Sequence, residues 1–268
     1  MADATLFLGG GNMATALIGG LLRSGRPAAA VTVVEPLAEQ RARLEQQFGV
    51  RTLAAADASL AGAAQVVWAV KPQVFPEAAA ACGRQLAQAL HLSVMAGIRC
   101  GAIAAATGAQ RIVRSMPNTP ALIGRGIAGL YATPAVSAAE RAQVEALLAP
   151  AGATLWVAQE ADLDAVTALS GSGPAYVFYF IEAMLQAAQD MGLSADQGRA
   201  LALATFAGAT ELARQSDEPV ALLRERVTSK GGTTHAALSS LQADGVREAF
   251  VRAIRAAQRR AHELGEAG

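Results

Sequence analysis

The sequence predicts an α/β protein with a doubly wound parallel sheet, followed by an all-α domain. Short apolar or β-branched runs alternate with helical patterns as far as residue 159. Strands that alternate with helices are typical of a parallel sheet covered by helices on both faces. From residue 160 to residue 268 the strand signal disappears and only helical patterns remain. We therefore predict two domains, at residues 1–159 and 160–268.

In the first predicted domain, each strand is a short run of apolar or β-branched residues. These runs lie at residues 5–8, 31–35, 66–70, 92–95, 111–115 and 154–157. Helical patterns lie between them, at about residues 12–22, 37–48, 76–90 and 137–148. Three glycines directly follow the first strand, and Gly49 ends the second helix as a glycine C-cap does.

The second predicted domain contains helical patterns at residues 163–168, 175–191, 195–215, 220–226, 234–241 and 246–264. The last helix has an apolar stripe at helical spacing, with its arginines largely on the other side. Apolar helices that have no sheet to pack on often bury such a stripe against a partner chain. We therefore expect a helical dimerisation domain, and the alternative is a self-contained monomeric bundle.

Composition and charge exclude several classes of protein. The 22 basic residues balance the 22 acidic ones and form no long basic run, which argues against nucleic-acid and membrane-surface partners. We find no apolar stretch of about 18 residues and no signal-peptide layout at the N-terminus, so we expect a cytoplasmic protein. Cys82 and Cys100 are too few for a disulfide framework or a metal site.

The turn after the first strand matches the dinucleotide-binding pattern G-x-G-x-x-(G/A). Its first glycine permits a tight turn, its second lets the backbone approach a pyrophosphate, and Ala14 lets the helix lie close to the strand. The helix N-terminus then faces the phosphates. We predict a coenzyme site here, rather than a purely structural turn, at Leu8, Gly9, Gly10, Gly11, Asn12 and Met13.

Glu35, at the end of the second strand, bears on which coenzyme is used. An acid at this place commonly accepts from the ribose 2′-hydroxyl, which favours NADH over NADPH. The alternative is a capping glutamate that points into solvent. Arg41 and Arg43 on the next helix could instead bind a 2′-phosphate, so the choice between NADPH and NADH stays open.

Other strand ends belong to the same predicted site, because ligands of open α/β sheets bind at the carboxyl ends of the strands. Lys71 is either a catalytic residue or a solvated one, and Asn118 lies on either a ligand-facing loop or a rigid turn between two prolines. The coenzyme-binding residues that we predict from these strand ends are Ala69, Val70, Lys71, Pro72, Ala96, Gly97 and Asn118.

Two segments rich in glycine and hydroxyl groups interrupt the helical half, at residues 170–174 and 229–234. Glycine costs about 1 kcal/mol relative to alanine inside a helix, so its clustering needs a reason. Glycines let backbone N–H groups converge on a small anion, and neighbouring hydroxyl groups add donors. With the dinucleotide turn, these segments indicate a hydride donor that faces a small carboxylate-bearing acceptor.

The motifs converge on one family. In chain order, five segments resemble the pyrroline-5-carboxylate reductases: residues 9–14, 70–72, 116–120, 164–176 and 227–234. The resemblance covers nearly the whole chain. It implies a Rossmann domain, a helical dimerisation domain, dimers that sometimes assemble into larger rings, and an acceptor loop that often comes from the other subunit. The implied activity is NAD(P)H-dependent reduction of 1-pyrroline-5-carboxylate to L-proline, the last step of proline biosynthesis.

The resemblance also implies roles for individual residues. Thr234 places its hydroxyl against the imine nitrogen, and Ser170, Ser172 and Pro174 lie beneath the nicotinamide. The substrate carboxylate is bound by Ser229, Gly231, Gly232, Thr233 and Thr234. Alternatively, Thr233 or Thr234 is only a helix N-cap. Reduction of an imine needs no strong base, which explains why His91, His235 and His262 form no evident His–Asp pair. A solvated or structural role is favoured for His235, since its neighbours already supply hydroxyl donors.

The sequence departs from the family pattern at two places. Lys230 stands where the family usually has proline, and residues 54–57 lack the asparagine that often helps to hold the adenosine ribose. Two other functions are weighed against the implied one. One is an NAD(P)H-dependent reductase of another small cyclic imine or keto acid, but Lys230 is the only lysine of the helical half and lies in a loop. The other is a catalytically silent NAD(P)-sensing dimer.

Overall fold

The structure is a computed structural model that describes residues 4–267, and it divides into two compact units. The first unit comprises the chain up to Pro174 together with the residues from Ala257 onward, and the second comprises Ala175–Ala256. The predicted boundary between residues 159 and 160 stays a prediction. None of the described helices is both long and apolar enough to cross a membrane.

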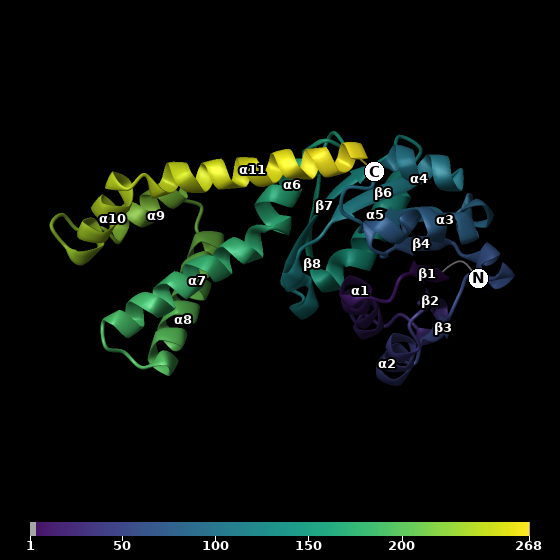
Figure 1. Ribbon diagram of the computed structural model, residues 1–268, viewed down its shortest axis with the longest axis horizontal. Coiled ribbons are helices and arrows are strands. Elements are labelled where there is room, and N and C mark those ends of the chain that lie inside the picture. The colour runs from purple at the N-terminus through teal and green to yellow at the C-terminus, as the bar shows by residue number, and fades with distance from the viewer. Residues whose placement is uncertain (1–3, 268) are drawn as a thin grey trace. The chain divides into compact units, whose positions relative to one another are not determined.

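The first unit contains one eight-stranded sheet, in the order β3-β2-β1-β4-β5-β6-β7-β8 (Figure 1). All neighbouring strands are parallel except β6 and β7. The order reverses direction between β1 and β4, which is where ligands bind in doubly wound sheets. The strands are β1 (Thr5–Leu8), β2 (Val31–Val34), β3 (Arg51–Leu53), β4 (Gln65–Trp68), β5 (Leu90–Ser93), β6 (Ile112–Met116), β7 (Gly126–Ala132) and β8 (Gly152–Trp156).

The predicted α/β fold class is confirmed, with two strands added and one pairing corrected. The sequence patterns did not predict β3, an edge strand of three residues, or β7, which contains two glycines. The sheet is not purely parallel, because β7 runs antiparallel to β6. Residues 117–125 connect the two strands, whereas a parallel crossover needs about a dozen residues or more.

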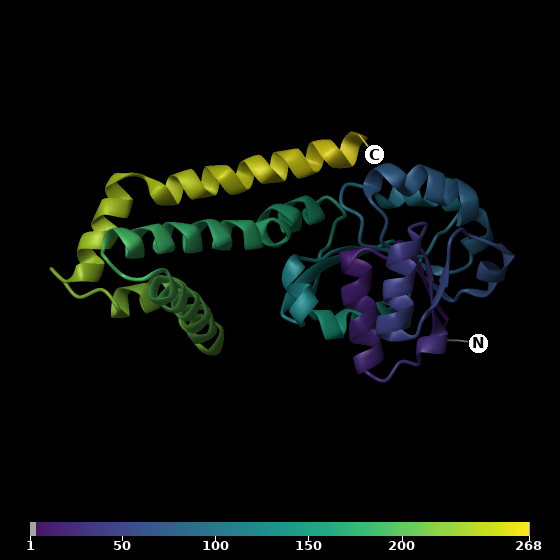
Figure 2. The ribbon, with the colours of Figure 1, turned by 60° about the horizontal axis from the view of Figure 1, so that its bottom comes forward.

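Helices cover both faces of the sheet (Figures 1 and 2). On one face, α1 (Asn12–Arg23), α2 (Ala38–Phe48) and α5 (Ala138–Leu148) bury leucines and valines with β1, β2 and β7. On the other face, α3 (Phe75–Cys82) and α4 (Cys100–Thr107) pack around Trp68. The predicted helix at 76–90 is shorter in the structure, and α4 is additional. Its alanine-rich sequence has little amphipathic pattern, since Ile103 is its only large apolar residue.

The first glycine–hydroxyl segment forms part of a helix rather than a loop. A short helix α6 (Asp162–Val166) continues through a π-helical turn, Thr167–Gly171, toward α7 (Gly173–Asp190). The Ser172 N–H donates to the Thr167 carbonyl at 2.8 Å, which is the spacing of a π-turn. A Cβ on Gly171 would lie 2.6 Å from the Met116 Cε, so glycine lets this turn pack against the end of β6.

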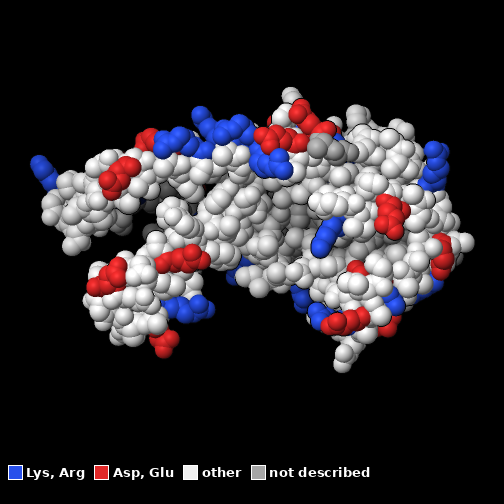
Figure 3. All heavy atoms as spheres, in the orientation of Figure 1, with Lys and Arg blue, Asp and Glu red and all other residues white. Residues whose placement is uncertain are grey.

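The second unit consists of helices alone: most of α7, then α8 (Ala195–Gln215), α9 (Val220–Arg226), α10 (Thr233–Ala243) and the first half of α11 (Val246–Ala267). Its buried residues are small, Ala188, Gly198 and Ala202, whereas Tyr179 is 70% exposed. Helices that expose so much apolar surface are stabilised by a partner. Figure 3 shows basic side chains gathered over α11, whose arginines are exposed.

Between β4 and β5 the core contains a fully buried polar pair, Trp68 and His91. The Trp68 Nε1–H donates to His91 Nδ1 at 2.9 Å, so the His91 proton lies on Nε2, 3.0 Å from the Leu86 carbonyl oxygen. Burial lowers the pKa of His91 below its ordinary value of 6.5. The imidazole is therefore held in its neutral form, which is a structural role.

This pair makes the stability depend on pH. Below pH 6.5 an unfolded chain binds a proton at His91 that the folded chain does not bind, so the contribution of His91 to stability is complete above pH 6.5 and falls as the pH drops. Urea denaturation at several pH values between 4.5 and 7.5 measures how the free energy of unfolding changes with pH. We expect this change to be smaller in His91→Gln than in the wild type, by up to about 1.4 kcal/mol per pH unit. An equal pH dependence of the unfolding free energy in the two proteins would contradict the role of His91.

Candidate active site

The glycine turn joins the ends of three strands. Gly9 has φ +97°, and a Cβ at this position would lie 2.7 Å from the Ala69 carbonyl oxygen. Its N–H donates to the Val34 carbonyl at 2.9 Å. Since only glycine adopts this conformation without strain and fits against the backbone of Ala69, the first glycine of the motif is required by the fold itself.

Gly11 has a different role. It is the N-cap of α1, with no side-chain cap, and a Cβ on it would meet nothing within 4 Å. Gly11 and Asn12 are exposed, and Met13 is half-buried. The first N–H groups of α1 therefore lie beside open space at the switch point of the sheet. This arrangement fits the pyrophosphate of a dinucleotide, which would bind to these N–H groups and to the positive end of the helix dipole.

Glu35 is buried against this turn, with 7% of its surface exposed. One carboxylate oxygen accepts from the Gly10 N–H and the other from the Leu37 N–H, both at 2.9 Å. The alternative of a glutamate that points into solvent is therefore wrong. The carboxylate holds the glycine turn in place, and its contact with a ribose stays a prediction.

The two arginines considered for a 2′-phosphate have partners in the structure. Arg41 Nη1 donates to the carbonyl oxygens of Glu35 and Pro36, at 2.9 and 2.7 Å. Arg43 pairs with Glu39 at 3.3 Å on the surface. Gln40, which the motif analysis missed, donates to the Gly10 carbonyl at 2.6 Å. It lies in the first turn of α2, and the dinucleotide pattern has no signal for it.

The structure brings the other predicted strand ends to the same edge of the sheet. The Ala69 N–H donates to the Leu8 carbonyl at 2.8 Å, so Ala69–Pro72 lies directly beside the glycine turn. Lys71 is exposed, and Pro72 begins a 3₁₀ turn. Ala96 and Gly97 follow β5, the neighbour of β4, and Gly97 has φ +77°.

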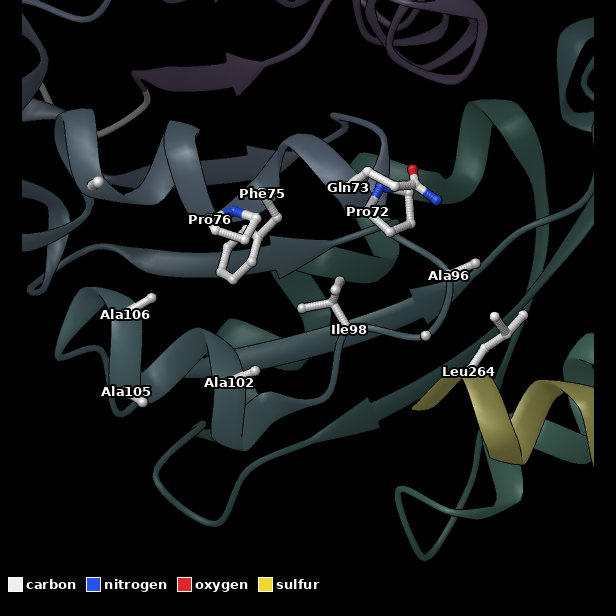
Figure 4. Close-up of a pocket in the computed structure, with 12 residues that line it drawn as sticks. Pro72, Gln73, Phe75, Pro76, Ala96, Ile98, Ala102, Ala105, Ala106 and Leu264 are labelled. Carbon is white, nitrogen blue, oxygen red and sulfur yellow. The ribbon is translucent and has the colours of Figure 1, made fainter. Parts of the chain in front are cut away.

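A cavity of about 990 Å³ lies beside these strand ends (Figure 4). Its lining is mostly apolar. Pro72 and Gln73 come from the segment after β4, Ala96 and Ile98 from the segment after β5, and Leu264 from the last turns of α11. Pro72, Ala96 and Gly97 also belong to the predicted coenzyme site, so the cavity and that site share part of their lining.

Asn118 and Ser170 both bond to the backbone. The Asn118 carboxamide oxygen accepts from the Ile127 N–H at 3.0 Å and ties the loop after β6 to β7. The Ser170 hydroxyl donates to the Val166 carbonyl at 3.0 Å inside the helical segment. Pro174 is half-buried in the first turn of α7. These bonds support the rigid-turn interpretation of Asn118, and contact of the three residues with a coenzyme stays a prediction.

An ion-pair network that the sequence did not indicate directly follows the Ala96–Gly97 segment in the chain. Arg99 Nη2 lies 3.0 Å from Asp164 Oδ2, and Arg99 Nε donates to the Gly265 carbonyl at 3.2 Å. Next to it, one oxygen of Glu160 accepts from the Cys100 N–H and from Arg114. The network links the loop after β5, α6 and the end of α11. His262 also contacts Asp164, at 3.3 Å, which agrees with a structural role.

The second glycine–hydroxyl segment is residues 229–234, which we name the substrate loop because the sequence predicts that it binds the substrate. It turns through Gly231, with φ +74°, and Gly232 is the N-cap of α10 without a side-chain cap. Thr233 and Thr234 lie inside the first turn of the helix, so the alternative that either threonine is the N-cap is wrong. Their hydroxyl groups are not needed to begin the helix, and the first N–H groups of α10 stay available to an anion.

Both cysteines are buried free thiols. Burial raises the pKa of Cys82 to about 11 and that of Cys100 to about 12. Both thiols therefore stay protonated at neutral pH and are poor nucleophiles. In residues 4–267, no group of three His, Cys, Asp or Glu residues could hold a metal ion.

A glycine turn at the N-terminus of α1, placed at the switch point of the sheet, defines an NAD(P)-dependent oxidoreductase. Comparison with known proteins agrees with this class. Residues 5–97 match the family described as NADP oxidoreductase coenzyme F420-dependent. Residues 160–264 match the family described as pyrroline-5-carboxylate reductase dimerisation.

Full-length relatives define the family. The chain is 44% identical over 262 residues to a pyrroline-5-carboxylate reductase of Pseudomonas aeruginosa, covering 97% of this chain and 96% of the relative. Its structure matches that of a pyrroline-5-carboxylate reductase from Coxiella burnetii with a TM-score of 0.91, 33% identity and coverage of 98% and 99%. A Plasmodium falciparum pyrroline carboxylate reductase with NADP bound matches with a TM-score of 0.87, 28% identity and 98% coverage of both chains. The chain belongs to the pyrroline-5-carboxylate reductase family, and the resemblance inferred from the motifs is confirmed.

Proposed function

We propose that this protein reduces 1-pyrroline-5-carboxylate to L-proline, with NADPH or NADH as the hydride donor, in the last step of proline biosynthesis. The observation that carries the proposal is the match of the whole chain to this family, with 44% identity to one relative. The glycine turn and the substrate loop each support the proposal. The first is an uncapped helix start that suits a pyrophosphate, and the second is an uncapped helix start beside hydroxyl groups that suits a carboxylate.

The reaction places few demands on the protein. The hydride comes from NAD(P)H when that coenzyme is bound, and it adds to the imine carbon of the substrate. The imine nitrogen carries a proton taken from solvent, and the electron pair of the C=N bond moves onto this nitrogen as the hydride adds, so the products are the secondary amine and NAD(P)⁺. Because no alkoxide develops, a hydrogen-bond donor at nitrogen suffices and a strong base is not needed. We assign that donor to the hydroxyl group of Thr234, which is half-buried.

The rest of the substrate loop binds the carboxylate. The N–H groups at the start of α10 and the positive end of its dipole favour an anion there. We assign this role to the backbone of Gly231, Gly232 and Thr233 and to the hydroxyl group of Ser229. A Cβ on Gly232 would lie 2.5 Å from Ser229 Oγ, so a side chain there would force the Ser229 hydroxyl group to rotate away.

On the coenzyme side, the protein orients the nicotinamide and excludes water from it. Gly9, Gly10, Gly11, Asn12 and Met13, after Leu8, would hold the pyrophosphate, and Glu35 would contact the adenosine ribose. The nicotinamide end is bounded by Ala69, Val70, Lys71, Pro72, Ala96, Gly97, Asn118, Ser170 and Pro174. The apolar cavity beside Pro72 and Ala96 supports this assignment, because a hydride transfers best where water is excluded.

We also propose that the working unit is a cytoplasmic homodimer, and that dimers associate into larger rings. The small core of the helical unit and its exposed aromatic residues support a partner of the same kind. Light scattering should give a mass of at least twice the 27.3 kDa of one chain, and a monomer would contradict the dimer.

Initial rates test the proposed activity. The purified protein is assayed with 1-pyrroline-5-carboxylate and with open-chain keto acids, using NADH and NADPH side by side. We expect NAD(P)H oxidation with the cyclic imine and little with the keto acids, and the ratio of the two coenzyme rates gives the preference. Equal or faster turnover of a keto acid would refute the proposal, and coenzyme binding without any turnover would indicate a sensor.

A further inference from the structure

The substrate loop begins with a β-turn of defined type. The Gly232 N–H donates to the Ser229 carbonyl at 3.0 Å, which closes a four-residue turn. Gly231, its third residue, has φ +74°. No non-glycine residue that the structure describes has a positive φ, so Lys230, the second residue, has a negative one. A negative value followed by a positive value defines a type II turn.

This geometry explains how the loop keeps its shape without proline. The second position of a type II turn suits proline but accepts other residues, because only the third position needs a positive φ. Lys230 therefore leaves the backbone of the turn unchanged. What lysine adds at this position is its charge.

The charge of Lys230 has no ion-pair partner in the part of the chain that the structure describes. Its side chain is exposed, and it takes part in none of the ion pairs found in residues 4–267. The first turn of α10 contains no acidic residue. The substrate loop thus combines an uncapped helix start, two threonine hydroxyl groups and one full positive charge. That combination suits a monovalent anion better than a neutral ligand.

We propose that Lys230 is a specificity-determining residue, whose ammonium group selects the carboxylate of the imine substrate by charge. The inference rests on the proposed function, because it assigns the substrate carboxylate to this loop. Lys230 strengthens the binding of substrate and product alike, so it lowers KM and leaves kcat unchanged. Because the side chain is exposed, its contribution is screened by salt.

Substitutions at Lys230 separate charge from turn geometry. Lys230→Gln removes the charge, Lys230→Pro removes the charge in a turn that accepts proline, and Lys230→Arg keeps the charge. At low ionic strength we expect the first two variants to raise the KM for 1-pyrroline-5-carboxylate about fivefold, and Lys230→Arg to keep the wild-type KM. The kcat and the KM for NAD(P)H should not change. In 0.5 M salt the wild-type KM should rise toward the value of Lys230→Gln.

A matched control removes a charge elsewhere in the helical unit. Arg214 is exposed on α8 and pairs only with its neighbour Glu211, among the ion pairs of the described residues, so Arg214→Gln should keep the wild-type KM. A second readout is independent of turnover. In the presence of NADP⁺, wild-type protein should bind L-proline more tightly than L-prolinamide, and Lys230→Gln should reduce this preference about fivefold.

The outcomes distinguish the two proposals. Absence of wild-type turnover with 1-pyrroline-5-carboxylate would refute the proposed function itself. Wild-type turnover with an unchanged KM in Lys230→Gln would refute only the role of Lys230. An equal rise in KM for Lys230→Gln and Lys230→Arg would also refute it, because the cause would then be side-chain shape rather than charge.

Discussion

Gly9→Ala is expected to abolish tight NAD(P)H binding and to lower the melting temperature of the protein. The added Cβ would lie 2.7 Å from the Ala69 carbonyl oxygen and 2.9 Å from the Val70 nitrogen, and both are backbone atoms that cannot rotate away. The φ of +97° adds strain for any residue with a Cβ. Strain and overpacking each cost about 1–3 kcal/mol, a large part of the stability of an ordinary domain.

Gly11→Ala is the matched control for this experiment. Gly11 has φ −68° and open space around it, so a methyl group there should leave the melting temperature unchanged. It should still weaken NAD(P)H binding, because the methyl group lies where the pyrophosphate approaches the backbone. Coenzyme titration by fluorescence and thermal denaturation measure the two effects. Wild-type stability and affinity in Gly9→Ala would show that the turn is not required in this form.

Thr234→Ala is expected to lower kcat by a factor of about 10²–10³, which corresponds to ~2.7–4 kcal/mol of transition-state stabilisation. The physical reason is the loss of the donor that we assign to the imine nitrogen as it takes up its proton. The fold should not suffer, because Gly232 rather than Thr234 caps α10. Steady-state kinetics with 1-pyrroline-5-carboxylate measure kcat, and thermal denaturation measures stability.

Two comparisons make the Thr234 result specific. Thr234→Ser keeps the hydroxyl group and should restore most of the rate. The KM for NAD(P)H should stay at its wild-type value in Thr234→Ala, because the coenzyme binds to the glycine turn. An unchanged kcat in Thr234→Ala would contradict the role of Thr234 as the donor to the imine nitrogen. Thr234 would then be only a structural residue of the first helical turn.

The sequence predicted those parts of the fold whose signals are local. The glycine turn at 9–11 and the β1 and α1 elements follow from residues that are neighbours in the chain. In contrast, β7 contains two glycines and α4 is largely alanine, so their local patterns are weak. Both elements are fixed by packing, α4 through Ile103 and β7 through pairing with β6 and β8.

The candidate site shows the same division. The motifs identified residues such as Gly9 and Thr234 by type and spacing, but they could not give side-chain orientation. Glu35 was expected either at a ribose or in solvent, and in the structure it accepts from the Gly10 N–H, 25 residues away. Arg99 was not predicted at all, since its partners Asp164 and Gly265 are 65 and 166 residues away.

By itself, the sequence determined the fold class, the family, the dinucleotide turn and the two glycine–hydroxyl segments, because each depends on residues within one turn, strand or helix. Only the tertiary structure decided that Glu35 holds the turn from inside, that residues 167–171 form a π-turn against Met116, and that Gly232 caps α10. These features depend on which atoms meet when distant segments pack, or on the backbone angles that result. Hydrophobic period and residue type do not specify such contacts.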